Sequence, residues 1–142
     1  MSDALLLDTH IALWLDTGSS RLRATTRSLI DECWQGGGRI LLSAITAWEI
    51  ALLFDLKRID LDVAVETWIE RFLGRPGVES VPVGHRAASR SSALHGFEQR
   101  DPADRILIAT AIEHGCPLVT YDAPIAKYSK RHGRRNGFAV AA

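Results

Sequence analysis

The chain has 142 residues, of which 46% are apolar, and its 17 basic and 17 acidic residues give a net charge of zero. This length fits one domain with its own core, spanning residues 1–142, and the composition excludes disordered, collagen-like and coiled-coil proteins. No apolar run reaches the roughly 18 residues of a membrane-spanning helix, and the acidic start does not resemble a secretory signal. Two cysteines fit a reducing compartment. We therefore expect a cytoplasmic protein with no membrane contact.

Short apolar runs bounded by turn residues recur along the chain. They predict buried strands at residues 4–7, 39–43, 78–83, 117–120 and 138–140. Between them, apolar residues repeat at steps of three and four, which predicts helices at residues 21–34, 44–56, 62–73, 86–94 and 102–114, with further helices beginning near residues 10 and 123. Strands that alternate with helices favour a layered α/β fold with a mostly parallel sheet.

Acidic residues follow two of the predicted strands. Asp8 ends the first apolar run, and Asp122 ends the fourth. In parallel sheets, ligands bind beyond the carboxyl ends of the strands, so both carboxylates would face the expected cleft. Each could instead cap the helix that follows it, because Asp is a preferred N-cap residue.

Three more acids lie on or beside predicted helices. Glu49 lies in the apolar helix 44–56, where a buried carboxylate must be paired, protonated or bound to a cation; the alternative is a partly exposed position on the wet side of the helix. Asp101 and Pro102 form a favourable helix start. Asp104 follows one turn later, which places it at the rim of the cleft if this helix packs on the sheet.

Four carboxylates, those of Asp8, Glu49, Asp104 and Asp122, would then converge on one cleft. Unpaired charges 4 Å apart repel each other by about 4 kcal/mol at an effective dielectric constant of 20. Such a cluster persists if some groups stay protonated or if a divalent cation neutralises them. Oxygen ligands favour Mg²⁺ or Mn²⁺, and the histidines show no spacing typical of zinc sites.

The segments that carry these acids are LLLDTH at 5–10, SAITAWEIA at 43–51, DPADRILIATA at 101–111 and LVTYD at 118–122. In this order, with 41, 55 and 18 residues between successive acids, the chain resembles the PIN-domain ribonucleases, specifically the VapC-type toxins. The resemblance implies a three-layer α/β/α sandwich with a mostly parallel central sheet.

The resemblance also implies an activity, the hydrolysis of phosphodiester bonds in single-stranded or structured RNA by an endoribonuclease that depends on Mg²⁺ or Mn²⁺. Asp8, Glu49 and Asp104 would bind the metal, and Asp122 would complete the site directly or through water. Thr9 and Thr120 would support these acids, and Asp101 could share or exchange the metal role of Asp104.

The expected partners follow from the same resemblance. They are the RNA substrate, a VapB-type antitoxin whose C-terminal segment fills the active-site groove, and a second copy of the chain in a homodimer within a larger toxin–antitoxin complex. DNA would be contacted only through the antitoxin.

Basic residues at two places in the chain are candidates for RNA binding. After Asp122 the chain has no acidic residue and five basic ones, a pattern that indicates either polyanion contact or a solvated helix face. The candidates are His10, Arg21, Arg23, Arg27, Lys127, Lys130 and Arg131. His10 or Trp14 could also stack on a base, with core packing as the alternative for Trp14.

Two other functions remain open from the sequence. A non-catalytic module of this fold could use the acids to bind a basic peptide. A metal-dependent phosphatase of the haloacid dehalogenase type also places an Asp after its first strand, but it needs a second Asp two residues later, where this chain has His10.

Overall fold

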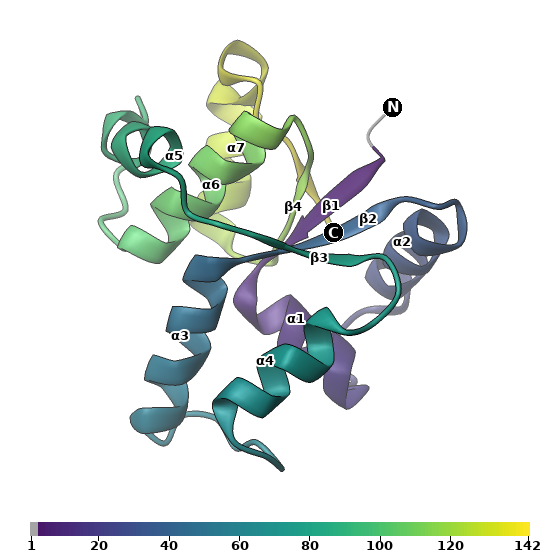
Figure 1. The fold of residues 1–142 in the computed structure, drawn as a ribbon. Helices are drawn as coiled ribbons and strands as arrows, with labels where there is room; N and C mark the ends of the chain where they lie inside the picture. Colours follow the sequence, from purple (N-terminus) through teal and green to yellow (C-terminus); the bar gives the residue numbers. More distant parts are fainter. Residues whose placement is uncertain (1–2) are drawn as a thin grey trace.

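The computed structural model describes residues 3–142, and within them the chain forms one sheet at the centre of the fold (Figure 1). Its strands are β1 (Ala4–Leu7), β2 (Arg39–Ser43), β3 (Val78–Val81), β4 (Leu118–Val119) and β5 (Val140–Ala141). They lie in the order β3-β2-β1-β4-β5, and every neighbouring pair is parallel. The most apolar strand, β1, therefore has its neighbours β2 and β4 on either side.

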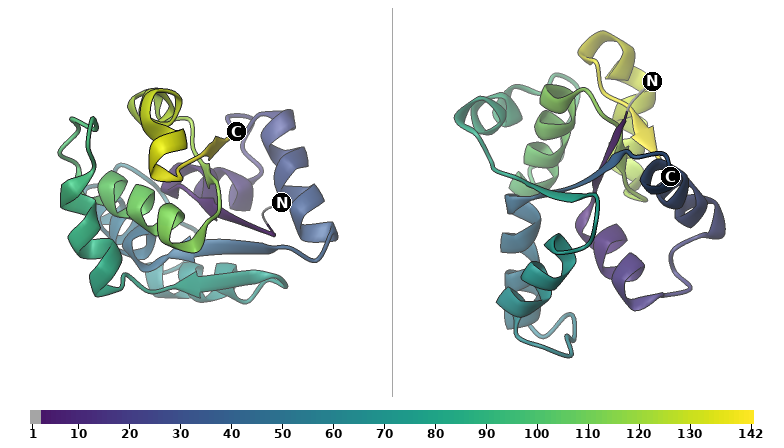
Figure 2. Two further views of the ribbon diagram at one scale, coloured as in Figure 1. Left: turned by 90° about the horizontal axis from the view of Figure 1, so that it is seen from above. Right: turned by 45° about the vertical axis from the view of Figure 1, so that its right-hand side comes forward.

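Helices connect the strands and cover both faces of the sheet. They are α1 (Thr9–Thr17), α2 (Ala24–Gln35), α3 (Ala44–Asp55), α4 (Val65–Leu73), α5 (His85–Arg90) with the short 3₁₀ helix Ser91–Ala93, α6 (Pro102–His114) and α7 (Ala123–Asn136). The second view of Figure 2 shows α6 and α7 above the strands and α1 and α4 below them. No helix in residues 3–142 is long and apolar enough to cross a membrane.

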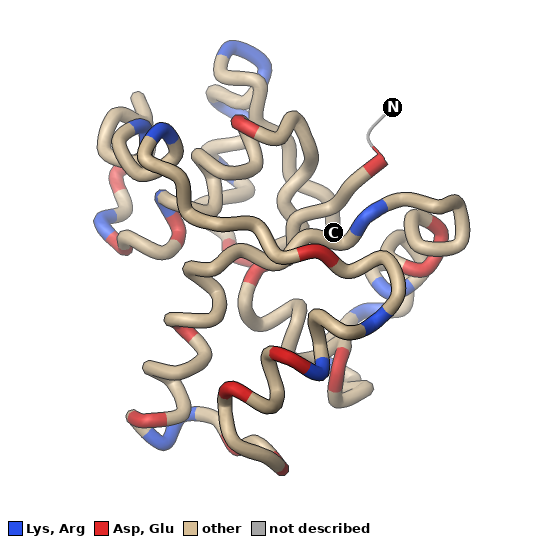
Figure 3. Tube along the Cα trace, viewed as in Figure 1, with Lys and Arg blue, Asp and Glu red and all other residues tan. Residues whose placement is uncertain are grey.

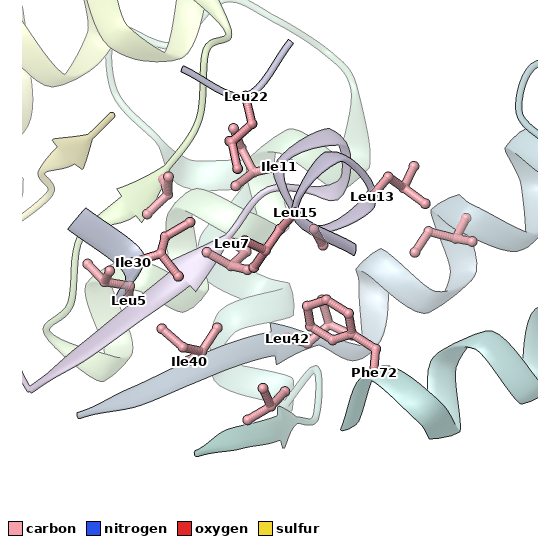
Figure 4. Close-up of a cluster of buried hydrophobic side chains, with 14 of the residues drawn as sticks. Leu5, Leu7, Ile11, Leu13, Leu15, Leu22, Ile30, Ile40, Leu42 and Phe72 are labelled. Carbon is pink, nitrogen blue, oxygen red and sulfur yellow. The ribbon is translucent and has the colours of Figure 1, made fainter. Parts of the chain in front are cut away.

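The two core layers follow from the alternation of side chains along β1. Leu5 and Leu7 pack with residues of α1, α2 and α4, among them Ile11 and Phe72 (Figure 4). Leu6 points to the other face and packs with residues of α6 and α7. A strand buried on both faces reads as a continuous apolar run. The predicted three-layer α/β/α sandwich is confirmed, with an all-parallel sheet in place of a mostly parallel one.

Several predicted boundaries shift for local reasons. The first helix begins at Thr9 because Asp8 caps it, and the predicted helix 86–94 gives way to the 3₁₀ turn after Arg90. The strand after Gly77 ends at Val81, since Pro82 has no N–H to donate. The last strand is Val140–Ala141, not 138–140, because Phe138 is buried in the core beside α7.

A buried carboxylate fixes the orientation of α1, the helix that begins at the candidate site. The side chain of Asp16 is 9% exposed and forms an ion pair with Arg75. It also accepts a hydrogen bond from Trp68 Nε1 at 2.9 Å. Both partners belong to α4 or the turn that follows it, so this contact locks α1 against α4.

Candidate active site

The ends of β1 and β4 bring Asp8 and Thr120 together. Leu7 and Val119 are register partners in these parallel strands, so the residues that follow them lie side by side. Thr120 Oγ1 donates a hydrogen bond to Asp8 Oδ2 at 2.6 Å, and the backbone N–H of Thr9 donates to Asp8 Oδ1 at 2.7 Å. Both oxygens of the Asp8 carboxylate are therefore held in place.

Glu49 reaches the same place from α3. The hydroxyl of Thr9, which is fully buried, donates a hydrogen bond to Glu49 Oε1. Because Thr9 directly follows Asp8, this bond sets Glu49 beside Asp8, as the sequence predicts. Both threonines that the sequence marks as supporting residues thus bind the side chain of a predicted acid.

Three of the acids also cap helices. Asp8 caps α1, Asp101 accepts a hydrogen bond from the N–H of Ala103 at 2.9 Å at the start of α6, and Asp122 accepts one from Ile125 at 3.0 Å at the start of α7. The positive ends of the helix dipoles favour negative charge at these positions. The capping role and the site role that the sequence left as alternatives therefore coexist.

Asp104, in the first turn of α6, is the carboxyl that all the others influence. Burial is the main cause that raises its pKa to about 7, and the charges of Asp101, Asp122, Asp8 and Glu49 raise it further, in that order. The charges of the other four acids thus act on Asp104, and the convergence of the four predicted carboxylates on one cleft stays a prediction.

The pKa values of Asp8 and Glu49 are raised as well. Burial is the largest cause that raises the pKa of each carboxyl. The hydrogen bonds from Thr120 and Thr9, and the nearby His10, act against it. In the chain alone, these carboxyls are therefore easier to protonate than exposed acids.

The donor set fits a hard divalent cation, since it consists of carboxylates with hydroxyl groups around them and contains no thiolate. The acids do not form a finished coordination shell, however. Among residues 3–142, no group of three or more His, Cys, Asp or Glu side chains is placed so that it could hold a metal ion as it stands. The acids therefore disfavour one another's charged forms, but their side chains are not arranged around a common metal position.

A cavity of about 330 Å³ opens beside these acids. Its lining comprises Asp8, His10, Ile11, Trp14, Arg21, Tyr121 and Asp122. The guanidinium of Arg23 lies 4.2 Å from the centre of the Tyr121 ring. Two of the predicted RNA-binding residues, His10 and Arg21, therefore line the same cavity as Asp8 and Asp122, and a third, Arg23, contacts the Tyr121 ring.

The other predicted RNA-binding residues lie elsewhere. Lys127 and Arg131 line a second cavity, of about 370 Å³, between α7 and residues 96–99. Lys130 is exposed on α7 and Arg27 is half-buried on α2, and neither lines these two cavities. Figure 3 shows basic positions gathered where α7 ends, apart from the acidic positions below the strands.

Arg105 is a supporting residue that the sequence reasoning missed. Its buried guanidinium donates to the carbonyl oxygens of Gln99 at 2.7 Å, Ser91 at 2.9 Å and Phe97 at 2.6 Å. It ties the segment before α6 to the helix that carries Asp104. The available sequence signal was a single charged residue, Arg105, directly before the apolar run 106–109.

Comparison with known proteins places this chain in a family. The PIN domain model matches residues 5–131. The chain belongs to the PIN-domain family. It is 34% identical to Ribonuclease VapC22 of Mycobacterium tuberculosis over 130 residues, which are 92% of this chain and 94% of that protein. The resemblance to VapC-type PIN proteins that the sequence shows is thereby confirmed.

Solved structures share the fold over almost the whole chain. VapBC2 from Rickettsia felis, bound to a promoter DNA fragment, matches with a TM-score of 0.65 at 13% identity, covering 97% of both chains. A toxin–antitoxin complex from Klebsiella pneumoniae matches with a TM-score of 0.60 at 22% identity, covering 96% of both chains. At these identities the likeness concerns the fold of this PIN domain.

The raised carboxyl pKa values predict an unusual pH dependence of stability. Between the ordinary value of 3.8 and about 7, the folded chain keeps a proton on Asp104 that the unfolded chain has lost. The metal-free PIN domain should therefore lose stability as the pH rises through this window and level off above it.

Thermal unfolding in EDTA between pH 5 and 8 measures this dependence for the wild type and for Asp104→Asn. The variant removes the titrating group but keeps its bulk, so its melting temperature should fall less with rising pH and should match or exceed that of the wild type at pH 8. Equal pH dependence in the two proteins would contradict the assignment, and a large loss of stability in the variant would mark Asp104 as structural.

Proposed function

We propose that this PIN domain is a divalent-metal-dependent endoribonuclease and the toxin of a VapBC-type toxin–antitoxin pair. The observation that carries the proposal is the contact between acids from separate elements: Thr120 and Thr9 hold Asp8 and Glu49 by hydrogen bonds, and the charges of both acids raise the pKa of Asp104 on α6. Membership of the PIN family and the identity to a protein named as a ribonuclease support it.

Asp8, Glu49 and Asp104 would hold Mg²⁺ or Mn²⁺, with Asp122 completing the site directly or through water. The cation would neutralise charge that develops on the phosphate and lower the pKa of a water molecule. Asp104 exchanges its proton near pH 7 in the metal-free chain, so cation binding should release protons there and strengthen as the pH rises.

The residues around the acids have their own tasks in this mechanism. The hydrogen bonds from Thr120 and Thr9 favour the ionised forms of Asp8 and Glu49 and fix the direction of their free lone pairs. Arg105 keeps the start of α6, and with it Asp104, at a constant position. Such preorganisation matters because a ligand that must first be oriented binds its cation more weakly.

The antitoxin would have an apolar surface to bind next to these acids. On α3, Trp48 is 53% exposed and Leu52 is 39% exposed, and Leu56, which follows the helix, is 50% exposed. They recur every fourth residue and so share one side of the helix. An antitoxin segment could pack along this stripe and place an Arg or Lys among the carboxylates that α3 and α6 carry.

The first test is the cleavage of a labelled RNA in the presence of Mn²⁺ or Mg²⁺. The wild type should cleave it, EDTA should abolish the activity, and p-nitrophenyl phosphate should not be hydrolysed. Failure to cleave any RNA with metal present would favour the module that only binds a basic peptide, and release of p-nitrophenol would favour the phosphatase.

Paired variants test the role of each acid in α6. Asp104→Asn should abolish cleavage, because it removes a charged ligand at the centre of the cluster. Asp101→Asn should have a mild effect, since Asn caps a helix about as well as Asp. Asp55→Asn, at an exposed position at the end of α3, is the matched control. Equal inactivation by Asp101→Asn and Asp104→Asn would show that both acids act in the site.

Inhibition by the antitoxin should compete with the metal, because its basic group would replace the charge of the cation. Titrating Mn²⁺ against a fixed amount of the complex should restore cleavage. Truncating the inserted Arg or Lys should weaken inhibition by about 2–5 kcal/mol, the usual cost of leaving a buried charge unpaired. Inhibition that changes neither with metal nor with loss of every basic residue in the segment would place the masking contact elsewhere.

A further inference from the structure

Three rings form a continuous wall in the cavity beside the acids. The ring centroid of Trp14 lies 5.6 Å from that of His10 and 5.9 Å from that of Tyr121. His10 is exposed, whereas Trp14 and Tyr121 are half-buried and pack against the core. The wall is thus anchored at one end and open to solvent at the other. It lines the same cavity of about 330 Å³ as Asp8 and Asp122.

Tyr121 is held in place by contacts with a segment far away in the sequence. Its hydroxyl donates a hydrogen bond to Thr26 Oγ1 at 2.6 Å and accepts one from the backbone N–H of Arg23 at 2.9 Å. The Arg23 guanidinium lies over the ring at 4.2 Å. These contacts fix the segment between α1 and α2, which places the exposed Arg21 in the cavity lining.

The cavity therefore combines features that recognise different parts of one ligand. The rings of the wall are tilted to one another, by 46° between His10 and Trp14 and by 35° between Trp14 and Tyr121, and each can offer a face to a planar ring. The exposed guanidinium of Arg21 favours a phosphate, whereas Asp8 and Asp122 repel an anion placed directly beside them. A free phosphate or an acidic peptide satisfies only the guanidinium. A nucleotide can make both contacts, because its base can stack on the aromatic rings and its phosphate can bind the guanidinium.

We propose that this cavity is a nucleobase subsite, in which the base next to the scissile phosphate stacks on the wall formed by His10 and Trp14 while Arg21 binds a flanking phosphate. The proposal rests on the proposed ribonuclease function and deepens it. Proteins recognise single-stranded RNA by stacking its bases on aromatic side chains and by arginine contacts to its backbone. A base paired in a duplex is not free to enter, so the subsite selects an unpaired nucleotide.

The test is the affinity for a short fluorescein-labelled single-stranded RNA, measured by fluorescence anisotropy in EDTA and at constant salt, where no cleavage occurs. Stacking on an aromatic side chain accounts for roughly 5–150-fold in affinity. His10→Ala and Arg21→Ala should each raise the Kd about tenfold. His10→Phe retains a ring and should retain the wild-type Kd.

Two controls separate stacking from general effects of charge and folding. Arg134→Ala removes one exposed positive charge near the end of α7, so it should change the Kd much less than Arg21→Ala. An RNA with an abasic nucleotide at the cut site should bind the wild type more weakly, and His10→Ala should lose no further affinity for it.

The outcomes distinguish this subsite from the nuclease itself. RNA binding that depends on His10 and Arg21 in a protein that cleaves nothing with Mn²⁺ would support the subsite and refute the nuclease. Cleavage by the wild type, with Kd and KM of His10→Ala and Arg21→Ala equal to those of Arg134→Ala, would overturn the subsite alone. Weaker binding of an antitoxin peptide with unchanged RNA affinity would assign the cavity to a protein side chain and also overturn it.

Discussion

Repulsion between partly buried carboxylates is the constraint on which the rest of this structure depends. Asp8, Glu49 and Asp104 all have raised pKa values, with burial as the largest cause and neighbouring acids adding to it. A fold keeps such a cluster only if other interactions hold the side chains where they repel one another. Groups of this kind are typical of functional sites, because the repulsion among them opposes folding.

The packing of the sheet holds the end of β1, and with it Asp8, in place. β1 is buried on both faces, between the cluster of Leu5 and Leu7 and that of Leu6, so its end cannot move away from β4 without exposing apolar surface. Hydroxyl and backbone N–H donors then stabilise the charged forms locally, and the starts of α1, α6 and α7 add positive helix ends. In the metal-free site, the packing and hydrogen bonds around the acids therefore oppose the repulsion between them.

The sequence was informative wherever the chemistry is local. The apolar runs before Asp8 and Asp122 placed both acids at strand ends, and the apolar surroundings of Glu49 marked it as unusual. The hydrogen bond between Thr9 and Glu49 and the contact of Tyr121 with Thr26 join residues far apart in the chain, so no local pattern predicts them. The same holds for the division of the basic residues between two cavities, which depends on how α7 and the segment before α2 pack on the sheet.

We propose that these acids bind one or more divalent cations. Diffraction from crystals of this PIN domain soaked in MnCl₂, recorded at a wavelength where manganese scatters anomalously, tests it most directly. We expect an anomalous peak bound by the carboxylates of Asp8 and Asp104, and its loss in Asp104→Asn crystals soaked in the same way. A wild-type map with no peak among these acids, or with manganese only at unrelated surface carboxylates, would contradict it.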